Sequence, residues 1–455
     1  MTYFFETYGC QMNKAESAQV KNLLAGRGWT ESPSPETADL AVINTCSVRK
    51  TAETRVFGRL GWYESLKAVR EGRGGAKTAA FPLAAERGTG RPLTVALMGC
   101  MAERLGDSLK KDFPVLDYVV GNFQKGDFAA IAARAEGASP AGELPAGEDL
   151  DCFTSHTPGE ASAYVPVMRG CDNFCAYCIV PYLRGREVSR PPGDILSELD
   201  ALSADGVREI TLLGQNVNSY RWDGLDFPGL AALTAAHLER TDSPIRWVRF
   251  LSSHPRDFSP ALAEAIAAAP RLCRHIHLPL QHGSDRILRA MNRGYTLGDY
   301  MEKVRLIREC LPDASLSTDI LVGFPGETED DVERTIAALG EARFEGAYTY
   351  YYNPREGTAA ASMPGQIPEA LKKERLSRVI EASLAVARRE MAKRVGSGAL
   401  VLVEGPARDS PSEVRARTAQ DGRVVFEAPS GLAGTFVKVQ LTALTGNTFR
   451  GRVIP

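Results

Sequence analysis

The chain has 455 residues, 44% of them hydrophobic, so it is long enough for two or three domains with cores of their own. Its formal net charge of -2 excludes a polycation, and any nucleic-acid surface must come from local segregation of the 54 Lys and Arg residues. The start, MTYFFETYGC, has no signal-peptide pattern, and no apolar run approaches the roughly 20 residues of a membrane span, which predicts a cytoplasmic protein without a membrane partner.

The nine cysteines are an odd number in a large chain without a secretion signal, which argues against a disulfide framework. We therefore expect reduced thiols that serve as ligands or nucleophiles. Six of them fall in suggestive places, whereas Cys152, Cys273 and Cys310 are interpreted as buried or incidental thiols.

Residues 1–135 are predicted to form an N-terminal parallel α/β domain, because short apolar strands alternate with helical stretches. The predicted strands are TYFFETYGC, LAVINTCS, LTVALMGC and DYVVG, and the predicted helices are KAESAQVKNLLAGRG and a stretch through about Tyr63. Three of these strands end at Cys10, Cys46 and Cys100. Ligands of open α/β sheets converge outside the carboxyl ends of the strands, so the three cysteines are predicted to form one site.

Two segments of this half of the chain are rich in Gly, Ala and charged residues. Gly72–Gly90 contains GRGGAK and ERGTGR and is predicted to be a surface loop. Residues 136–160 are dominated by Gly, Pro, Ala and Glu and are predicted to be a linker.

Residues 161–370 are predicted to form a partial (βα)6 barrel. The predicted strands are AYVPVMR, EITLLG, RWVRFLSS, RHIHLPL, SLSTDILVGF and GAYTYYYN, and amphipathic helices lie between them. Directly after the first strand come Cys171, Cys175 and Cys178 with C-x3-C-x2-C spacing. Closed zinc sites and electron-transfer clusters normally take four protein ligands, so three thiolates leave one coordination position for a substrate or cofactor.

The last two predicted parts are a basic helix over residues 371–395 and a small antiparallel β-barrel over residues 396–455. The helix carries eight basic and three acidic residues between residues 371 and 394, which fits either a solvated face or a contact with nucleic acid. Small barrels of this kind often bind nucleic acid. Its candidate basic residues, which ordinary surface charge explains nearly as well, are Arg408, Arg415, Arg417, Lys438, Arg450 and Arg452.

The C-x3-C-x2-C motif after the first strand of a βα barrel resembles the radical S-adenosylmethionine (SAM) superfamily. The resemblance implies that Cys171, Cys175 and Cys178 hold a 4Fe-4S cluster whose fourth iron binds the amino and carboxylate groups of SAM. One electron from such a cluster cleaves SAM to a 5′-deoxyadenosyl radical, which activates unreactive C–H bonds. The alternative is a zinc site.

Further strings are similar to one branch, the methylthiotransferase family, over nearly the whole chain. They are TYGCQMNKAES, NTCSVRKTAETRVFGRLG, LMGCMAER, LGQNVNSY, HLPLQHGSDRILRAMNRG, STDILVGFPGET and YYNPREGTAAA, together with the Cys171 loop. The C-terminal segment resembles the RNA-binding TRAM domain of this family. In the family, Cys10, Cys46 and Cys100 would hold an auxiliary 4Fe-4S cluster that carries the sulfur to be donated. One SAM would methylate that sulfur, and a second would supply the radical.

The strings YGCQMN, NTCSVR and LGQNVNSY look most like the tRNA enzymes that convert C2–H to C2–SCH3 in N6-isopentenyl (dimethylallyl) adenosine at position 37. The alternatives are threonylcarbamoyl-adenosine in tRNA, or an aspartate of a ribosomal protein. A non-enzymatic iron-sulfur or zinc RNA-binding protein is a third interpretation. The resemblance implies the tRNA anticodon stem-loop and an electron donor such as flavodoxin or ferredoxin as partners. The sulfur donor stays open, and nothing demands more than a monomer.

Other cofactor contacts are predicted from barrel position and from the resemblance, although turn formation or polar capping of a barrel end explains several of them equally well. The predicted contacts are Tyr177, Gly214, Gln215, Gln281, Asp319, Gly323 and Gly326. Arg184, Arg186 and Arg190 follow the cysteine loop and could face phosphates, cluster charge or solvent. The barrel histidines are expected to be satisfied core or rim residues, because their spacing fits no metal site.

Overall fold

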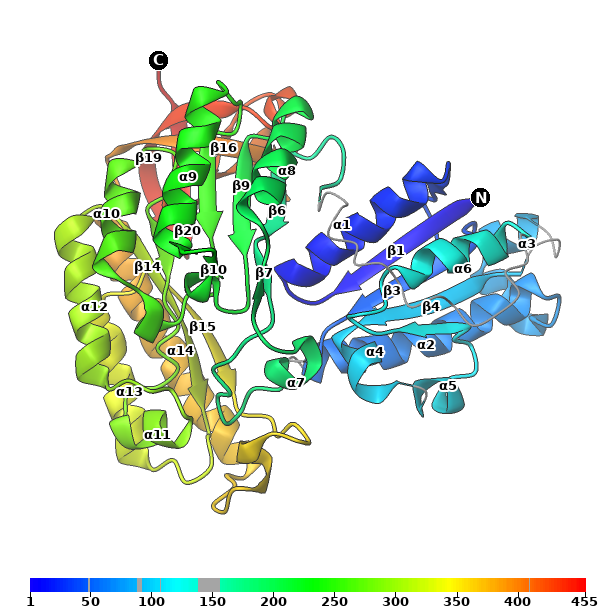
Figure 1. Cartoon of the computed structure of the whole chain (residues 1–455), viewed down its shortest axis with the longest axis horizontal. Coiled ribbons are helices and arrows are strands. Elements are labelled where there is room, and N and C mark those ends of the chain that lie inside the picture. The colour runs from blue at the N-terminus through cyan, green and yellow to red at the C-terminus, as the bar shows by residue number, and fades with distance from the viewer. Residues whose placement is uncertain (48–49, 88–91, 107, 138–155, 409) are drawn as a thin grey trace. The chain divides into compact units, whose positions relative to one another are not determined.

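In the computed structural model, residues 1–47, 50–87, 92–106, 108–137, 156–408 and 410–455 are described. The chain divides into two compact units (Figure 1). Unit 1 comprises Met1–Thr157 with Tyr182–Gly185, and unit 2 comprises Pro158–Pro181 with Arg186–Pro455. The predicted linker, residues 136–160, lies largely outside the described residues, as does Cys152.

Unit 1 is built on a parallel five-stranded sheet with the strand order β2-β1-β3-β4-β5. The strands are β1 (Thr2–Tyr8), β2 (Thr30–Glu31), β3 (Leu40–Thr45), β4 (Thr94–Gly99) and β5 (Tyr118–Val120). The helices are α1 (Gln11–Gly26), α2 (Lys50–Arg70), α3 (Pro82–Arg87), α4 (Cys100–Leu105), α5 (Ser108–Asp112) and α6 (Asp127–Ala135), with a 3-10 helix η1 (Gly75–Ala80). The predicted parallel α/β fold of this domain is confirmed.

Alternate residues of the central strand β3 enter two different cores because successive side chains of a strand point to opposite faces. Leu40 and Val42 pack in the core formed with residues of α1 and α6, and Ala41 and Ile43 pack in the core formed with residues of α2. Figure 1 shows α1 and α2 on opposite sides of the sheet. All six residues of β3 are therefore buried.

The prediction that Gly72–Gly90 is only a surface loop is wrong for its described part. η1 and α3 form there, and Phe81 between them is 3% exposed. The Phe81 ring meets Trp62 of α2 edge-on, with the ring centroids 5.1 Å apart, in the core on that side of the sheet. Because Gly and charged residues dominate the segment, its composition did not predict that one aromatic residue, Phe81, packs into the core.

Unit 2 contains the six predicted parallel strands in chain order. They form the sheets β6-β9-β12 and β13-β14-β15, joined by a parallel bridge between Val248 and Leu272. The strands are β6 (Ser162–Pro166), β9 (Glu209–Leu213), β12 (Trp247–Phe250), β13 (His275–His277), β14 (Ser315–Val322) and β15 (Gly346–Tyr351). The helices after them are α7 (Val180–Arg184), which runs on into unit 1, α8 (Pro192–Ala204), α9 (Phe227–Arg240), α10 (Pro260–Ala268), α11 (Asp285–Ala290), α12 (Leu297–Cys310) and α13 (Glu329–Ala342). One large core joins the strands to α8, α9, α10, α12 and α13, as the predicted α/β barrel region requires.

The predicted basic helix and the small barrel are both present, but the barrel is not wholly antiparallel as predicted, because Arg423–Val425 pair in parallel with Thr448–Arg450. The helix is α14 (Glu369–Ala392), and the closed barrel has the order β16-β17-β18-β20-β19. The barrel strands are β16 (Gly398–Pro406), β17 (Glu413–Thr418), β18 (Arg423–Glu427), β19 (Phe436–Thr445) and β20 (Thr448–Val453). Short pairs and 3-10 turns complete the unit: β7 (Met168–Arg169), β8 (Val188–Ser189), β10 (Arg221–Trp222), β11 (Leu225–Asp226), η3 (Val217–Ser219), η4 (Pro255–Asp257), η5 (Ala359–Ser362) and η6 (Ser430–Leu432).

The hairpin between β17 and β18 docks on the amino-terminal side of the β strands. Arg249 of β12 donates to the carbonyls of Thr418 (2.7 Å) and Ala419 (3.0 Å), and its Nε bonds Glu209 at 2.6 Å. Arg417 of the barrel also pairs with Glu209. Because a buried ion must be paired, this network fixes the barrel on the parallel strands of unit 2.

Most of the basic side chains between residues 371 and 394, in α14 and just after it, are neutralised by ion pairs. Lys372 donates to the carbonyl of Tyr352, and six further basic side chains of residues 371–394 pair with carboxylates: Lys373, Arg375, Arg378, Arg389, Lys393 and Arg394. The helix therefore offers less free positive charge than its composition indicates.

No helix within the described ranges combines the length and the apolar character that crossing a bilayer requires.

We expect Phe81→Ala to lower the free energy of unfolding of unit 1 by about 3 to 4 kcal/mol, since it opens a cavity against Trp62. Leu83→Ala, in the same segment but 43% exposed, is the matched control and should cost less than about 0.5 kcal/mol. Denaturant unfolding monitored by Trp fluorescence measures both changes. Equal, small effects would contradict the packed arrangement.

Candidate functional site

In unit 1 the three predicted ligand cysteines follow three adjacent strands that end in register. Tyr8 of β1 pairs with Thr45 of β3, and Thr45 pairs with Gly99 of β4. Cys10 comes two residues after β1, whereas Cys46 and Cys100 directly follow β3 and β4. The topology therefore brings all three to the same edge of the sheet, as the sequence predicts for a common site.

Two asparagines order this edge. Asn13 Nδ2 donates to Asn44 Oδ1 (2.8 Å) and to the carbonyl of Thr45 (3.0 Å), while Asn13 Oδ1 accepts from the backbone N–H of Cys10 (3.2 Å). Gly99 has φ +94°, and a Cβ there would lie 2.5 Å from Asn44 Oδ1. Glycine in MGC is thus required by the close approach of Asn44, as well as by its backbone conformation.

A buried guanidinium lies beside Cys100. Arg184 donates to Glu16 at 2.8 and 3.2 Å, and both side chains are under 10% exposed. Burial raises the pKa of the Cys100 thiol, and the positive charge of Arg184 partly opposes that rise. Of the three predicted roles for Arg184, this placement supports a position facing the charge of a thiolate-bound cluster. Arg186 and Arg190 instead pair with Asp172 and Glu198.

In unit 2 the C-x3-C-x2-C loop is closed at its base by the antiparallel pair β7 and β8, in which Met168 pairs with Ser189. Cys171 and Cys175 are buried, and Cys178 is half-buried. Burial raises the pKa of the Cys171 thiol, and it raises that of Cys178 to about 12. Burial therefore favours the protonated form of these thiols, and a metal that binds them must displace their protons.

Arg293 places a buried positive charge against Cys175 of this loop. Its Nη1 lies 3.2 Å from Cys175 Sγ and 3.5 Å from the Tyr177 hydroxyl, and its Nη2 donates to the carbonyl of Pro279 at 3.1 Å. The residue is 5% exposed, and no carboxylate of the described chain forms an ion pair with it. A buried cation needs an anionic partner, which thiolates or the carboxylate of a bound ligand would supply.

Unpartnered polar atoms mark the same end of the parallel strands. Gln215 Oε1 and Asn218 Nδ2 follow β9, His254 Nε2 follows β12, and all three are buried without a hydrogen-bond partner. Burial, with the charges of Arg293 and Arg256, lowers the pKa of His254 to about 2, so the ring is neutral. Three thiols, a buried cation and three orphaned polar atoms together fit a bound cluster and a polar ligand with a carboxylate, as SAM is.

The other predicted contacts lie in the same unit with different surroundings. Gln281 has φ +69° and bridges to Ile320, and Asp319 lies 3.4 Å from His277 Nε2. A Cβ on Gly214 would meet Met168, and one on Gly323 would meet Lys372, so both glycines have a packing reason besides any ligand. Gly326 has φ +75°, and a Cβ there would lie 3.9 Å from Arg286 Nη1. Cofactor binding by Tyr177, Gly214, Gln215, Gln281, Asp319, Gly323 and Gly326 stays a prediction.

The barrel histidines have protein partners. His275 and His277 both contact Ser317 Oγ, and His282 bonds Glu327 at 3.1 Å. Within the described residues, no three His, Cys, Asp or Glu side chains are gathered closely enough for a single metal ion. In a 4Fe-4S cluster each thiolate binds a different iron atom, so its ligands are spaced by the cluster.

Sequence reasoning missed Arg293, Asn218 and Asn44, and considered His254 only as a core or rim residue. Arg293 lies 118 residues from Cys175, so no local spacing indicates their contact. Arg293 and Asn218 lie in the strings AMNRG and LGQNVNSY, and the similarity of these strings to the methylthiotransferase family could have indicated both residues.

Comparison with known proteins matches both units. The profile of the Radical SAM superfamily matches residues 165–339, and that of the uncharacterized protein family UPF0004 matches residues 2–121. A tRNA-2-methylthio-N(6)-dimethylallyladenosine synthase of Treponema denticola is 47% identical, with 100% of both chains covered. The chain belongs to this synthase family. Synthases of the same name from Treponema pallidum and Moorella thermoacetica are 44% and 37% identical, and each alignment covers 100% of this chain and at least 98% of the relative.

Solved structures resemble the synthase in fold. The radical SAM methyltransferase TsrM of Kitasatospora setae matches with a TM-score of 0.57 and 15% identity, covering 79% of this chain and 77% of TsrM. The cobalamin-dependent enzyme OxsB gives a TM-score of 0.53 at 9% identity, covering 85% of this chain and 57% of OxsB. At these identities the likeness concerns the fold alone.

Replacing Cys171, Cys175 and Cys178 together with alanine should remove about half of the iron of the reconstituted synthase, and so should replacing Cys10, Cys46 and Cys100. Cys310→Ala, at a half-buried cysteine outside both sets, is the control and should retain all of it. Iron and acid-labile sulfide analysis measures the loss. Full iron content in either triple variant would contradict that ligand set.

Gly99→Ala should destabilise unit 1 by about 2 to 3 kcal/mol and lower its cluster occupancy, because the new Cβ collides with Asn44 and the backbone of Thr45. Gly106→Ala is the matched control, with φ +50° and no atom within 4 Å of its added Cβ, and should cost about 1 kcal/mol. Denaturant unfolding and iron analysis of the two variants measure the difference. Equal effects would contradict the assigned close approach.

Proposed function

We propose that this synthase converts N6-isopentenyl (dimethylallyl) adenosine at position 37, in the tRNA anticodon stem-loop, to its 2-methylthio derivative, with SAM as methyl donor and as radical source. The observation that carries this proposal is the 47% identity over the whole of both chains to a relative named for that reaction. The six cysteines at strand ends in two separate units support two cluster sites.

In unit 2, Cys171, Cys175 and Cys178 would hold the SAM-binding 4Fe-4S cluster. A bound cluster with SAM supplies one-electron chemistry that can break an unactivated C–H bond. Arg293 would then bind the carboxylate or the cluster charge, and Gln215, Asn218 and His254 would satisfy their free polar atoms on SAM or the adenosine. Because His254 is neutral, it can orient a ligand by hydrogen bonding, but it carries no proton to donate as an imidazolium.

In unit 1, Cys10, Cys46 and Cys100 would hold the auxiliary 4Fe-4S cluster. Their common edge is lined by Asn13, Asn44 and the Glu16–Arg184 pair. These side chains would keep the edge polar and would present hydrogen-bond donors to a negatively charged cluster. The open position of that cluster would take the sulfur that is transferred.

The same proposal includes an electron donor and a source of sulfur. An electron donor such as flavodoxin or ferredoxin would reduce the cluster, and the source of sulfur stays open. The cytoplasmic location and the monomeric state stay predictions from the sequence. No observation on the described residues favours threonylcarbamoyl-adenosine or a ribosomal-protein aspartate over isopentenyl adenosine.

The test is an anaerobic reaction of the reconstituted enzyme with dithionite, SAM carrying a deuterated methyl group and isopentenylated tRNA, followed by nucleoside mass spectrometry. We expect labelled 2-methylthio-isopentenyladenosine from the wild type and from Cys310→Ala, and none from Cys175→Ala. If the wild type makes 5′-deoxyadenosine but leaves that nucleoside unmodified, the proposed substrate is wrong. Parallel reactions with threonylcarbamoyl-adenosine tRNA and ribosomal protein would then identify the acceptor.

A further inference from the structure

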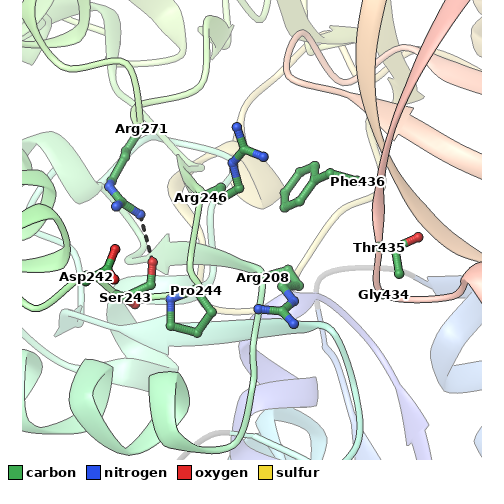
Figure 2. Close-up of a pocket in the computed structure, with 9 residues that line it drawn as sticks. All are labelled: Arg208, Asp242, Ser243, Pro244, Arg246, Arg271, Gly434, Thr435 and Phe436. Atoms are coloured by element: carbon green, nitrogen blue, oxygen red, sulfur yellow. Dashed lines mark hydrogen bonds between the residues drawn. The ribbon is translucent and has the colours of Figure 1, made fainter. Parts of the chain in front are cut away.

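A second candidate site lies at the opposite end of the parallel strands from the cysteine loop. It is a pocket of about 520 Å³ in unit 2, shown in Figure 2, whose charged lining is Arg208, Arg246, Arg271 and Asp242. Gly434, Thr435 and Phe436 at the start of β19 complete it, so the C-terminal barrel supplies one wall. None of these residues belongs to the predicted cluster or cofactor site.

Two of the arginines occupy equivalent positions just before neighbouring strands, and the third lies one register position further along. Arg208 directly precedes β9, Arg246 directly precedes β12, and Arg271 precedes Leu272, which bridges to β12. The backbone N–H of Arg246 donates to the carbonyl of Arg208 (2.9 Å), and that of Val248 donates to the carbonyl of Arg271 (2.8 Å). Parallel pairing therefore holds three guanidinium-bearing residues side by side on one edge of the sheet.

Only one of these arginines is neutralised within the described part of the protein. Arg271 Nε bonds Glu239 at 2.7 Å, and its Nη1 donates to the carbonyls of Ser243 (3.2 Å) and Ile245. Neither Arg208 nor Arg246 forms an ion pair with any residue in the described part of the chain, and Asp242 is the single carboxylate in the lining. The pocket thus keeps a net positive charge in a chain whose total charge is -2.

Aromatic contacts hold the wall of the pocket in place. The Arg246 guanidinium carbon lies 5.1 Å from the centroid of the Phe436 ring, which meets Trp247 edge-on at 4.8 Å. Figure 2 shows Arg246 between Arg271 and this ring, with Arg208 below. A guanidinium restrained by an aromatic face loses less entropy when it binds an anion, and its planar donor fork matches phosphate oxygens.

Three basic residues of the barrel are neutralised by ion pairs. Arg415 and Arg417 pair with Glu404, Arg417 also pairs with Glu209, and Arg450 pairs with Glu413. Arg408, Lys438 and Arg452, the other barrel residues that the sequence singled out, are exposed and form no ion pair within the described part of the chain. Arg208 and Arg246 add two unpaired guanidinium groups where the barrel meets the parallel strands.

We propose that Arg208 and Arg246 bind a backbone phosphate of the RNA substrate in this pocket, with Arg271 as a fixed third guanidinium. This inference rests on the proposed function only in taking RNA as the ligand. The site would position the RNA from the far side of the barrel and would take no part in the chemistry.

The test is equilibrium binding of isopentenylated tRNA to the full-length, cluster-loaded enzyme without SAM, measured by fluorescence anisotropy over a range of salt concentrations. For the double variant Arg208→Gln with Arg246→Gln we expect about tenfold weaker binding. The slope of log affinity against log salt should become shallower by about 0.7 to 0.9 for each phosphate that the variant no longer binds. Asp242→Asn removes the opposing carboxylate and should tighten binding, and Arg305→Gln, at an exposed arginine on α12, should change neither quantity.

Unchanged affinity and slope in the double variant, with iron content and thermal stability equal to wild type, would overturn the inference. If millimolar inorganic phosphate raises the Tm of the wild type but not of the double variant, while RNA binding is equal in both, the pocket takes free phosphate and the RNA assignment is wrong. A double variant that loses RNA affinity supports the site even if the wild type fails to methylthiolate that tRNA, so failure of the proposed reaction is recognised separately.

Discussion

The burial of cysteine thiols at the carboxyl ends of parallel strands is the constraint on which the rest of this structure depends. A thiolate out of water is unstable unless a metal or a cation balances its charge. The raised pKa values of Cys100, Cys171 and Cys178 express that cost directly. A bound metal would supply that balance, provided that its affinity for thiolate exceeds the cost of removing the thiol protons.

Each unit places one buried arginine beside its cysteines. Arg184, already paired with Glu16, acts on Cys100, and Arg293, which pairs with no carboxylate of the described chain, donates to Cys175. The two arginines therefore differ in the positive charge that they can offer to a ligand. The charge in unit 1 is largely compensated by the protein, whereas the charge in unit 2 is available to a ligand that enters with its own carboxylate.

Local patterns in the sequence were enough for the cysteines, the parallel sheets, the basic helix and the terminal barrel, because spacing and hydrophobic alternation are properties of short segments. They were not enough for contacts between distant segments. Arg293 reaches Cys175 across 118 residues, and Arg249 reaches Thr418 across 169. Phe81 was missed because one aromatic residue in a Gly-rich, charged segment leaves no periodic signal. The free positive charge of residues 371–394 was overestimated because partners such as Glu327 and Glu345 lie in distant segments of the chain.

The most direct test of this account is whether the cluster held by Cys171, Cys175 and Cys178 has an open iron that binds SAM. A variant with Cys10, Cys46 and Cys100 replaced by alanine would be reconstituted, reduced and mixed with SAM carrying 15N at its amino group, then measured by pulsed electron-nuclear double resonance. The account predicts a strong 15N coupling to the cluster. A 4Fe-4S signal without that coupling, or a variant that binds zinc instead of iron, would contradict it.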